Sequence, residues 1–329
     1  MPERAPSVMT TGMEPITFAP VYLEHVWGGR AMEHVYGRTL PRPDRVYGEA
    51  WEIVDRDPEQ SVVEHGEWAG LTLHELWSER REAVFGAGFE DAPRFPLLFK
   101  VLDARDDLSI QVHPPAEVIA RLGGEFKNEM WYIADCAPGA KLYVGLKAGV
   151  TREAFEAAIR EGTVAACVHV LTPQPGESIF IPIGRLHAIG AGFLIHEIQQ
   201  NSDTTYRVFD WNRLGLDGKP RQLHVAASLA SIDFDDCEPT MDRPVGDTLA
   251  ECRYFKTTRQ VLAVGDTLGN PEAGRFSILV VVDGCLQSAA GRQFGKGQSL
   301  LLPRDAAPLT AQQNTTVLQV TLPAGDGSQ

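Results

Sequence analysis

The sequence predicts an all-β protein with a few short helices. Short apolar runs such as LLFKVLDA (97–104) and FSILVVVDG (276–284) recur along its 329 residues. Glycine or proline punctuates these runs at intervals of about ten residues, which is typical of an antiparallel sandwich or barrel. After about residue 235 the chain is nearly pure β in character.

Helical signals are confined to the first two-thirds of the chain. The segment LTLHELWSERREAVFG (71–86) has Thr72 as a candidate N-cap. The segment TREAFEAAIREG (151–162) begins at Thr151 and ends on a glycine. A short helical turn is expected after the prolines of PPAEVIARLGG (114–124). These helices should be inserted in, or packed against, the first β unit.

Composition and charge argue against several classes of protein. Apolar residues make up 43% of the chain, enough for a packed core, and no segment approaches the length of a membrane span. The net charge of −14 argues against binding to nucleic acid or to an anionic membrane. An anionic substrate would therefore need a site that is locally basic.

The cysteines and the N-terminus indicate the compartment. The five cysteines are scattered and contain no C-x-x-C pair. This pattern favours a reducing compartment and argues against disulfides and a thiolate metal site. Residues 1–15 lack the apolar core of a signal peptide and are expected to form a flexible tail. A cytoplasmic protein is predicted.

A weak internal repeat suggests a duplication. The stretch GESIFIPIGRLHAI, from Gly176, aligns without gaps to GQSLLLPRDAAPLT, from Gly297, with Gly, Ser and Pro matching. His187 falls opposite Pro308, so only the first copy should carry chemistry. We expect a catalytic domain over 16–235 and a degenerate copy over 236–329.

One predicted strand has a polar face. In LSIQVHP (108–114) Ser109, Gln111 and His113 alternate with apolar residues, so the three polar side chains share one face. That face either meets water or points into a barrel, where polar groups need partners. The pattern alone leaves the choice open.

A glycine-proline motif favours the barrel. Residues Gly176 to His187 have the form G-x5-P-x-G-x2-H, which resembles the second motif of the cupin superfamily of metal-binding jelly-roll barrels. Cupins usually place their other ligands in an H-x-H segment followed by a glutamate. Here Gln111 stands for the first histidine, followed by His113 and then Glu129. The fold expected is two jelly-roll (cupin) units.

This departure fits one branch of the superfamily. The chain resembles the type I mannose-6-phosphate isomerases, and in particular their short bacterial form. The resemblance covers roughly residues 20 to 235. It rests on LSIQVHP (108–114), KNEMWYI (127–133), PIGRLHA (182–188) and HEIQQNSDTTYRVFDWNR (196–213), with support from VWGGR (26–30), GEAWEI (48–53) and RFPLLFKVLDA (94–104).

The resemblance implies a metal site. It would hold one Zn²⁺ per chain, with the ligands Gln111, His113, Glu129 and His187. Two imidazoles and a carboxylate with an open position are typical of a catalytic zinc site. The same set also suits Fe(II) oxygenases. A glutamine oxygen is an unusual ligand, and Gln111 would otherwise be a hydrogen-bonding amide inside the barrel.

The resemblance also implies a reaction, the interconversion of D-mannose 6-phosphate and D-fructose 6-phosphate by proton transfer between C1 and C2. Arg207 matches an active-site arginine of the family. The base is open between Glu197 and a metal-bound water. Period-two alternation places Lys127 on the strand face of Glu129, where it would grip the phosphate, with Ser109 as a further substrate contact.

Other interpretations remain open. The chain could be a bicupin Fe(II) dioxygenase, or a cupin that binds a sugar phosphate without turnover. Lys127 and Arg207 would be solvated surface charges if the faces were assigned wrongly. The remaining histidines, His25 and His224 among them, lack ligand spacing and are expected to be ordinary residues. A monomer or a weak dimer is expected.

Overall fold

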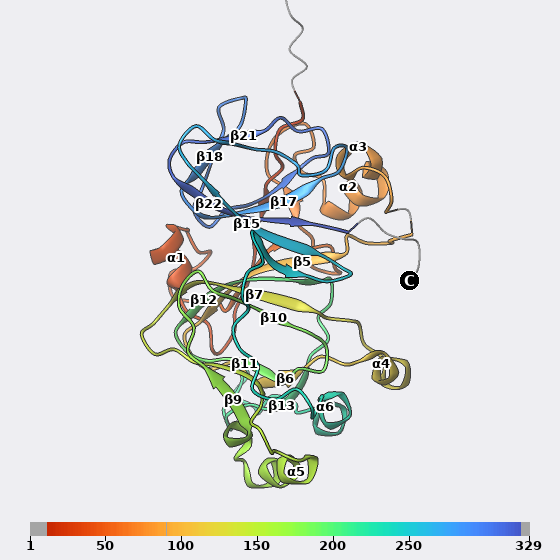
Figure 1. Ribbon diagram of the computed structural model, residues 1–329, viewed down its shortest axis with the longest axis vertical. Helices are drawn as coiled ribbons and strands as arrows, with labels where there is room; N and C mark the ends of the chain where they lie inside the picture. The colour runs from red at the N-terminus through yellow and green to blue at the C-terminus, as the bar shows by residue number, and fades with distance from the viewer. Residues whose placement is uncertain (1–11, 90, 324–329) are drawn as a thin grey trace, which may run out of the picture. The chain divides into compact units, whose positions relative to one another are not determined.

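The structure, a computed structural model, describes residues 12–89 and 91–323 (Figure 1). The chain forms two compact units. The larger unit comprises Ala19–Ser61 and Arg94–Tyr254, and the smaller unit comprises the remaining described residues. None of the described helices has the length and apolar character needed to span a membrane.

The larger unit is built from two antiparallel sheets that enclose a core. The six-stranded sheet has the order β10 (Ser178–Ile181), β7 (Glu129–Cys136), β12 (Phe193–Gln200), β5 (Leu97–Ala104), β3 (Glu49–Ile53) and β2 (Val21–Leu23). The five-stranded sheet has the order β13 (Tyr206–Phe209), β6 (Ile110–Val112), β11 (His187–Ile189), β8 (Leu142–Leu146) and β9 (Val168–Leu171). Ile133 and Ile195 of the first sheet pack with Val144 and Ile189 of the second.

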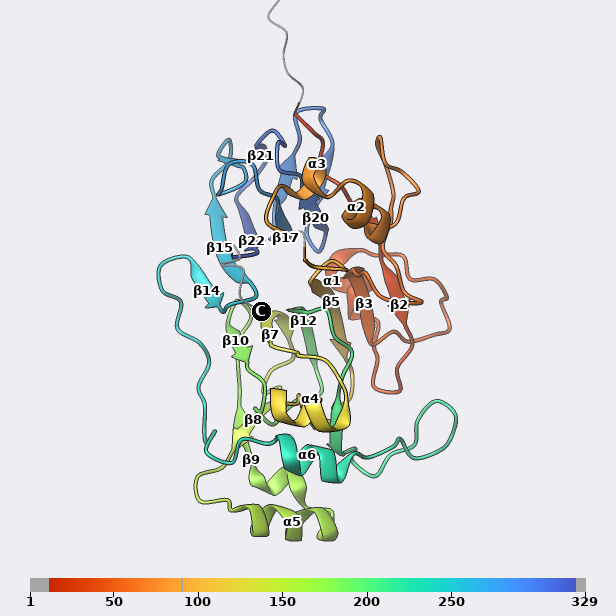
Figure 2. The ribbon, with the colours of Figure 1, turned by 90° about the vertical axis from the view of Figure 1, so that its right-hand side faces the viewer.

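Short helices cover the outside of the larger unit. They are α1 (Ala31–Tyr36), α4 (Ala116–Leu122), α5 (Arg152–Glu161), the 3₁₀ turn η1 (Val164–Cys167) and α6 (Val225–Ser231). Figure 2 shows α6 between α4 and α5. The boundaries predicted for α5 are confirmed, because Thr151 caps its first turn and Gly162 ends it at φ 71°.

Helix α1 covers the outer face of the six-stranded sheet. Its Met32 packs against Val101 of β5 and Leu194 of β12. On the same face the Tyr36 hydroxyl lies 2.8 Å from Nε2 of His196, which is buried. Along β12 the side chains alternate, so His196 faces α1 and its neighbour Glu197 faces the interior.

The smaller unit repeats the topology of the larger one. Its first sheet includes β15 (Lys256–Leu262), β22 (Thr315–Thr321), β17 (Ser277–Asp283) and β20 (Ser299–Leu302), and its second has β16 (Thr267–Leu268), β21 (Leu309–Ala311), β18 (Cys285–Gln287) and β19 (Gln293–Gly295). The order β15-β22-β17-β20 matches β5-β12-β7-β10 of the larger unit, and β16-β21-β18-β19 matches its β6-β11-β8-β9. The common order supports the duplication that the glycine-proline repeat suggested.

The smaller unit contains an apolar cluster of its own. Leu279, Leu300 and Val317 are completely buried in one cluster. In the larger unit, Glu129 at the start of β7 pairs with Ile181 at the end of β10. The corresponding pair in the smaller unit is Ser277 of β17 with Leu302 of β20, so a serine stands where the larger unit has the glutamate. Among the described residues, no group suited to a metal ion lies in this unit.

The division of the chain differs from the expected boundary at residue 235. The larger unit continues through β14 (Thr248–Glu251), and residues 62–93 belong with the C-terminal strands. These residues form β4 (Val62–Val63), which pairs with β1 (Phe18–Ala19), and the helices α2 (Leu73–Glu79) and α3 (Arg81–Phe85).

Aromatic packing explains why these helices join the smaller unit. The Phe85 ring makes an edge contact with Phe276 at 5.1 Å. The expected single helix over 71–86 is interrupted at Arg80, and Thr72 caps α2 in a capping box with Glu75. A flexible tail was expected over residues 1–15. Residues 1–11 of it lie outside the described residues, and Met13 forms a β-bridge with Ala306.

Candidate active site

The polar face of residues 108–114 points into the larger unit. Gln111 of β6 pairs with His187 of β11 on one side and with Arg207 of β13 on the other. Opposed residues of neighbouring strands share a face, so these three side chains form a row across the five-stranded sheet. Ser109 and His113 lie on the same face by period two.

Three of the predicted ligands converge. His113 Nε2 lies 3.2 Å from Glu129 Oε2, and His187 Nε2 lies 3.5 Å from Glu129 Oε1. One donor atom from each residue lies within 4.8 Å of the other two. All three side chains are buried. Because Glu129 comes from β7 and the histidines from the other sheet or its edge, the fold itself assembles the group.

Backbone carbonyls orient both imidazoles. His113 Nδ1 lies 3.0 Å from the carbonyl of Thr204, and His187 Nδ1 lies 2.9 Å from that of Arg185. A carbonyl only accepts, so each Nδ1 carries the proton and each Nε2 keeps its lone pair. Burial lowers the pKa of both rings, that of His113 to about 3, so both are neutral at pH 7.

The carboxylate of Glu129 is also prepared for a cation. Burial would raise its pKa, but the Lys127 ammonium, 3.2 Å from Oε2, acts together with His113 and His187 to hold that pKa well below its usual range. Its Oε1 is buried and has no hydrogen-bond partner among the described residues. Such an oxygen is costly, and a metal ion would satisfy it. The donor set fits a divalent metal ion.

Gln111 lies beside this group. Its Nε2 is 3.3 Å from His187 Nε2, and its Oε1 accepts a 3.4 Å hydrogen bond from the Ser109 hydroxyl. The same hydroxyl oxygen accepts a 3.1 Å hydrogen bond from Arg207 Nε. Ligation by Gln111 would require its amide oxygen to turn toward the imidazoles.

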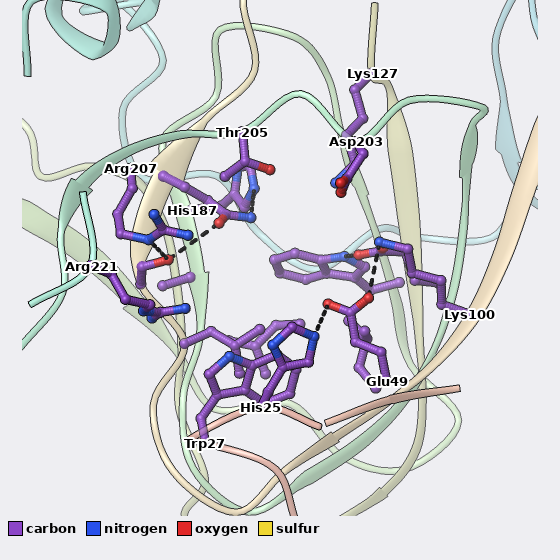
Figure 3. A pocket seen from close by; sticks show the side chains of 18 of the residues that line it. His25, Trp27, Glu49, Lys100, Lys127, His187, Asp203, Thr205, Arg207 and Arg221 are labelled. Atoms are coloured by element: carbon purple, nitrogen blue, oxygen red, sulfur yellow. Dashed lines mark hydrogen bonds and ion pairs between the residues drawn. The ribbon is translucent and has the colours of Figure 1, made fainter. Parts of the chain in front are cut away.

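His187 and Gln111 form part of the wall of a cavity of about 310 Å³ (Figure 3). This volume lies in the usual range for small-molecule sites. The predicted residues Ser109, Lys127, Glu197 and Arg207 also line it. Seven polar or charged lining residues had not been predicted as site residues: His25, Glu49, Lys100, Asp203, Thr205, Arg221 and His224.

A second polar row faces the first from the six-stranded sheet. Lys100 of β5, Glu197 of β12 and Trp131 of β7 are directly opposed. Lys100 Nζ lies 3.4 Å from Glu197 Oε1, and Trp131 Nε1 donates to Glu197 Oε2 at 2.9 Å. Burial and the charge of Glu129 raise the pKa of Glu197. A buried carboxylate of this kind can exchange a proton with a bound substrate.

Basic groups occupy two regions of the wall. Arg207 and Arg221 lie on one side in Figure 3, and Lys127 lies on the other. Arg221 Nε donates to Asp210 at 2.7 Å, which fixes its guanidinium at the cavity. The ammonium of Lys127 is already paired with the carboxylate of Glu129. Arg221 is therefore the better-placed group for a distant anionic part of a ligand.

Comparison with known proteins identifies the family. A family model described as "Phosphomannose isomerase type I, catalytic domain" matches residues 16–135. The chain is 37% identical to the mannose-6-phosphate isomerase ManA of Bacillus subtilis over 307 residues, which cover 90% of this chain and 94% of that protein. The chain belongs to the type I phosphomannose isomerase family.

Solved structures agree with this phosphomannose isomerase fold. The mannose 6-phosphate isomerase from Bacillus subtilis matches with a TM-score of 0.83 at 30% identity, covering 94% of this chain and all (100%) of that one. A mannose 6-phosphate isomerase bound with zinc and yttrium matches with a TM-score of 0.73, covering 94% and 99%. At 17% identity this second match shows the fold alone.

Lys100 is the clearest residue of this phosphomannose isomerase that motif reasoning missed. It is the one charged residue inside the run LLFKVL, and all eight residues of β5 are buried. A lysine in such a strand needs a carboxylate partner. That signal was present in the sequence, but its partners Glu49 and Glu197 are distant along the chain.

Proposed function

We propose that this phosphomannose isomerase interconverts D-mannose 6-phosphate and D-fructose 6-phosphate by moving a proton between C1 and C2. The main support for this function is the buried His-Glu-His group, which lies beside a cavity lined by paired acids and bases. The membership of the chain in this family points to the same reaction. A cavity lined mainly by charged and polar groups suits a sugar phosphate better than an apolar substrate.

The metal would be one Zn²⁺ per chain. His113, Glu129 and His187 would hold it, with Gln111 as a further ligand once its amide oxygen turns. A zinc-bound mannose 6-phosphate isomerase with the same fold supports this choice. A metal ion here supplies a Lewis acid that stabilises negative charge on the substrate oxygens.

The residues around the group would divide the remaining work. Glu197 is the base that takes a proton from one carbon and returns it to the other, since its raised pKa suits proton transfer. Arg207, in the row with Gln111 and His187, would place positive charge near the enediol oxygens. Ser109 and Lys127 would bind substrate hydroxyls near the reacting carbons.

We place the phosphate at Arg221, with Arg207 beside it. Sequence reasoning assigned the phosphate to Lys127, but that ammonium lies 3.2 Å from Glu129 Oε2 and is 3% exposed. A phosphate there would sit next to a metal ligand rather than at the far end of a six-carbon sugar. The guanidinium of Arg221 suits a phosphate in shape and charge.

Anaerobic turnover with and without a chelator tests the function. Mannose 6-phosphate should give fructose 6-phosphate without oxygen, and metal removal should abolish the reaction. A requirement for oxygen would favour a dioxygenase. Binding of the sugar phosphate without any turnover would favour a non-catalytic cupin. Either result would overturn the proposal.

Replacing Arg221 should weaken phosphate recognition. Arg221→Met removes a charge-assisted contact worth roughly 1.5–3 kcal/mol, so kcat/KM should fall about ten- to hundred-fold, mainly through KM. The preference for mannose 6-phosphate over unphosphorylated mannose should fall by the same factor. The same constants measured for Lys127→Met should show a loss in kcat as well. Preference lost only in Lys127→Met would return the phosphate to Lys127.

Arg213 offers a matched control for this comparison. Its Nη2 lies 3.0 Å from Asp210, the carboxylate that also holds Arg221, but Arg213 is not part of the cavity wall. Arg213→Met should therefore change KM far less than Arg221→Met. Equal effects would mean that the loop, and not the Arg221 charge, accounts for the loss.

A further inference from the structure

A line of polar contacts runs along one wall of the cavity, from a buried end to a partly exposed end. At the buried end, Trp131 donates to Glu197, whose Oε1 lies 3.4 Å from Lys100 Nζ. The same ammonium lies 3.4 Å from Oε2 of Glu49. The other oxygen of Glu49 lies 3.5 Å from His25 Nε2. Figure 3 shows the outer two contacts meeting at Glu49.

Exposure is low at the inner two members of this line and higher at the outer two. The exposed fraction of the side chain is 5% for Glu197 and 4% for Lys100, and it rises to 15% for Glu49 and 31% for His25. His25 is therefore the member of the line that meets water. When a substrate fills the cavity, the line remains as a route between the buried carboxylate and the solvent.

The chemistry of His25 suits proton relay. Burial lowers its pKa, so the ring is neutral at pH 7 and carries one N–H and one lone pair. Its Nε2 has no hydrogen-bond partner among the described residues, which leaves it available to Glu49. A neutral imidazole can accept a proton at one nitrogen and release one from the other.

The backbone fixes His25 in this position. Its ring stacks on Trp27 with the centroids 4.7 Å apart and the planes 7° from parallel. A Cβ at Gly48 would lie 2.6 Å from the Trp27 ring and 2.7 Å from His25 Cβ. Glycine at position 48 thus lets the strand that carries Glu49 press against the His25–Trp27 pair.

We propose that His25 and Glu49 form the outer part of a proton relay that connects the catalytic carboxylate Glu197 with solvent. The proposal rests on the proposed function, in which Glu197 takes a proton from C2 and returns one to C1. The relay lets the proton held by Glu197 exchange with water before it is returned. His25 then takes part in proton transfer although it does not contact C1 or C2.

The transfers balance at every step. The C2–H bond breaks, its electron pair forms the C1–C2 double bond of an enediolate with the negative charge on the C1 oxygen, and the proton goes to the Glu197 carboxylate. Protonated Glu197 passes its hydrogen to Lys100 as the ammonium passes one of its own to Glu49. Rotation of the ammonium mixes its hydrogens, and Glu49 exchanges with water through His25. The reverse transfers return a solvent hydrogen to Glu197 and then to C1, while the hydroxyl proton on the C2 oxygen moves to the C1 oxygen and leaves a carbonyl at C2.

Conversion of mannose 6-phosphate in D₂O tests the relay. Fructose 6-phosphate collected at low conversion is analysed by NMR and mass spectrometry for deuterium on C1. The wild-type product should carry deuterium in part of the molecules. In His25→Phe the deuterium incorporated per turnover should fall about ten-fold, less than the 10²–10⁴ of a positioned proton-transfer group because some water still enters the cavity.

Two further variants separate relay from structure. His25→Gln keeps a polar group beside Glu49 but cannot pass a proton, so it should lose the label as His25→Phe does. Glu49→Gln breaks the line at its next member with the same result. His224→Phe, which alters another cavity histidine outside the line, should keep the wild-type ratio of deuterium to turnover.

The failures can be told apart. If no fructose 6-phosphate forms, the proposed function is wrong. If it forms without deuterium in the wild type, or if His25→Gln and Glu49→Gln incorporate as much deuterium per turnover as the wild type, the relay is wrong while the function stands. Because the readout is a ratio within the product, a general loss of activity does not imitate the result.

Discussion

His113→Ala and His187→Ala should each lose the bound metal and nearly all isomerase activity. Each change removes an Nε2 lone pair that faces Glu129. Loss of a Lewis acid worth several kcal/mol corresponds to a fall in kcat/KM of about 10³-fold or more. Metal content by mass spectrometry should fall from near one ion per chain to a small fraction of that.

The stoichiometry also tests the smaller unit. No histidine follows His224 in the sequence, and among the described residues of that unit no group is suited to a metal ion. His224→Ala is a control, because it removes a cavity histidine that lies outside the metal group. It should keep the metal. Full occupancy in His187→Ala, or a second ion that survives it, would contradict the proposed ligands.

Glu197→Gln should lower kcat by about 10²–10⁴-fold with a much smaller change in KM. The amide keeps the shape of the side chain but cannot accept the proton from carbon. Since burial raises the pKa of Glu197, activity should be present above that raised pKa and lost as pH falls through it. The acid limb of the kcat profile should therefore lie above the pH of an ordinary glutamate.

Turnover and the pH profile of Glu197→Gln are both informative. An exposed glutamate on α4, Glu117, gives a control in which Glu→Gln should leave kcat unchanged. A Glu197→Gln enzyme with near wild-type kcat and the same acid limb would contradict a carboxylate base. That result would assign proton transfer to water in the cavity.

The metal group was predictable because its signals are local. Gln111 and His113 lie on one alternating strand, and His187 ends a glycine-proline motif. The structure places their side chains near Glu129, and their role as metal ligands stays a prediction. The all-β class was equally accessible, since short apolar runs and turn residues recur along the chain.

The other side of the cavity was harder to predict from the sequence because its residues meet only in the folded chain, in part through sheet pairing. His25, Glu49 and Lys100 lie far apart in the sequence, and Glu197 joins them through the register of β5 with β12. Spacing rules for metal ligands pass over all four, and only Glu197 was named in advance, as a candidate base that the family resemblance implied. The division into units was obscured similarly, because an apolar helix face does not say which sheet it will cover.

The alternation along β12 has a consequence for folding fidelity. A slip of one residue would turn Glu197 against α1 and bring His196 into the cavity. It would strand a buried carboxylate away from Lys100, at a cost of several kcal/mol for an unpaired ion. The Glu197–Lys100 pair therefore also favours the correct register of β12. A shifted register would be less stable, and it would also remove the proposed base from the cavity.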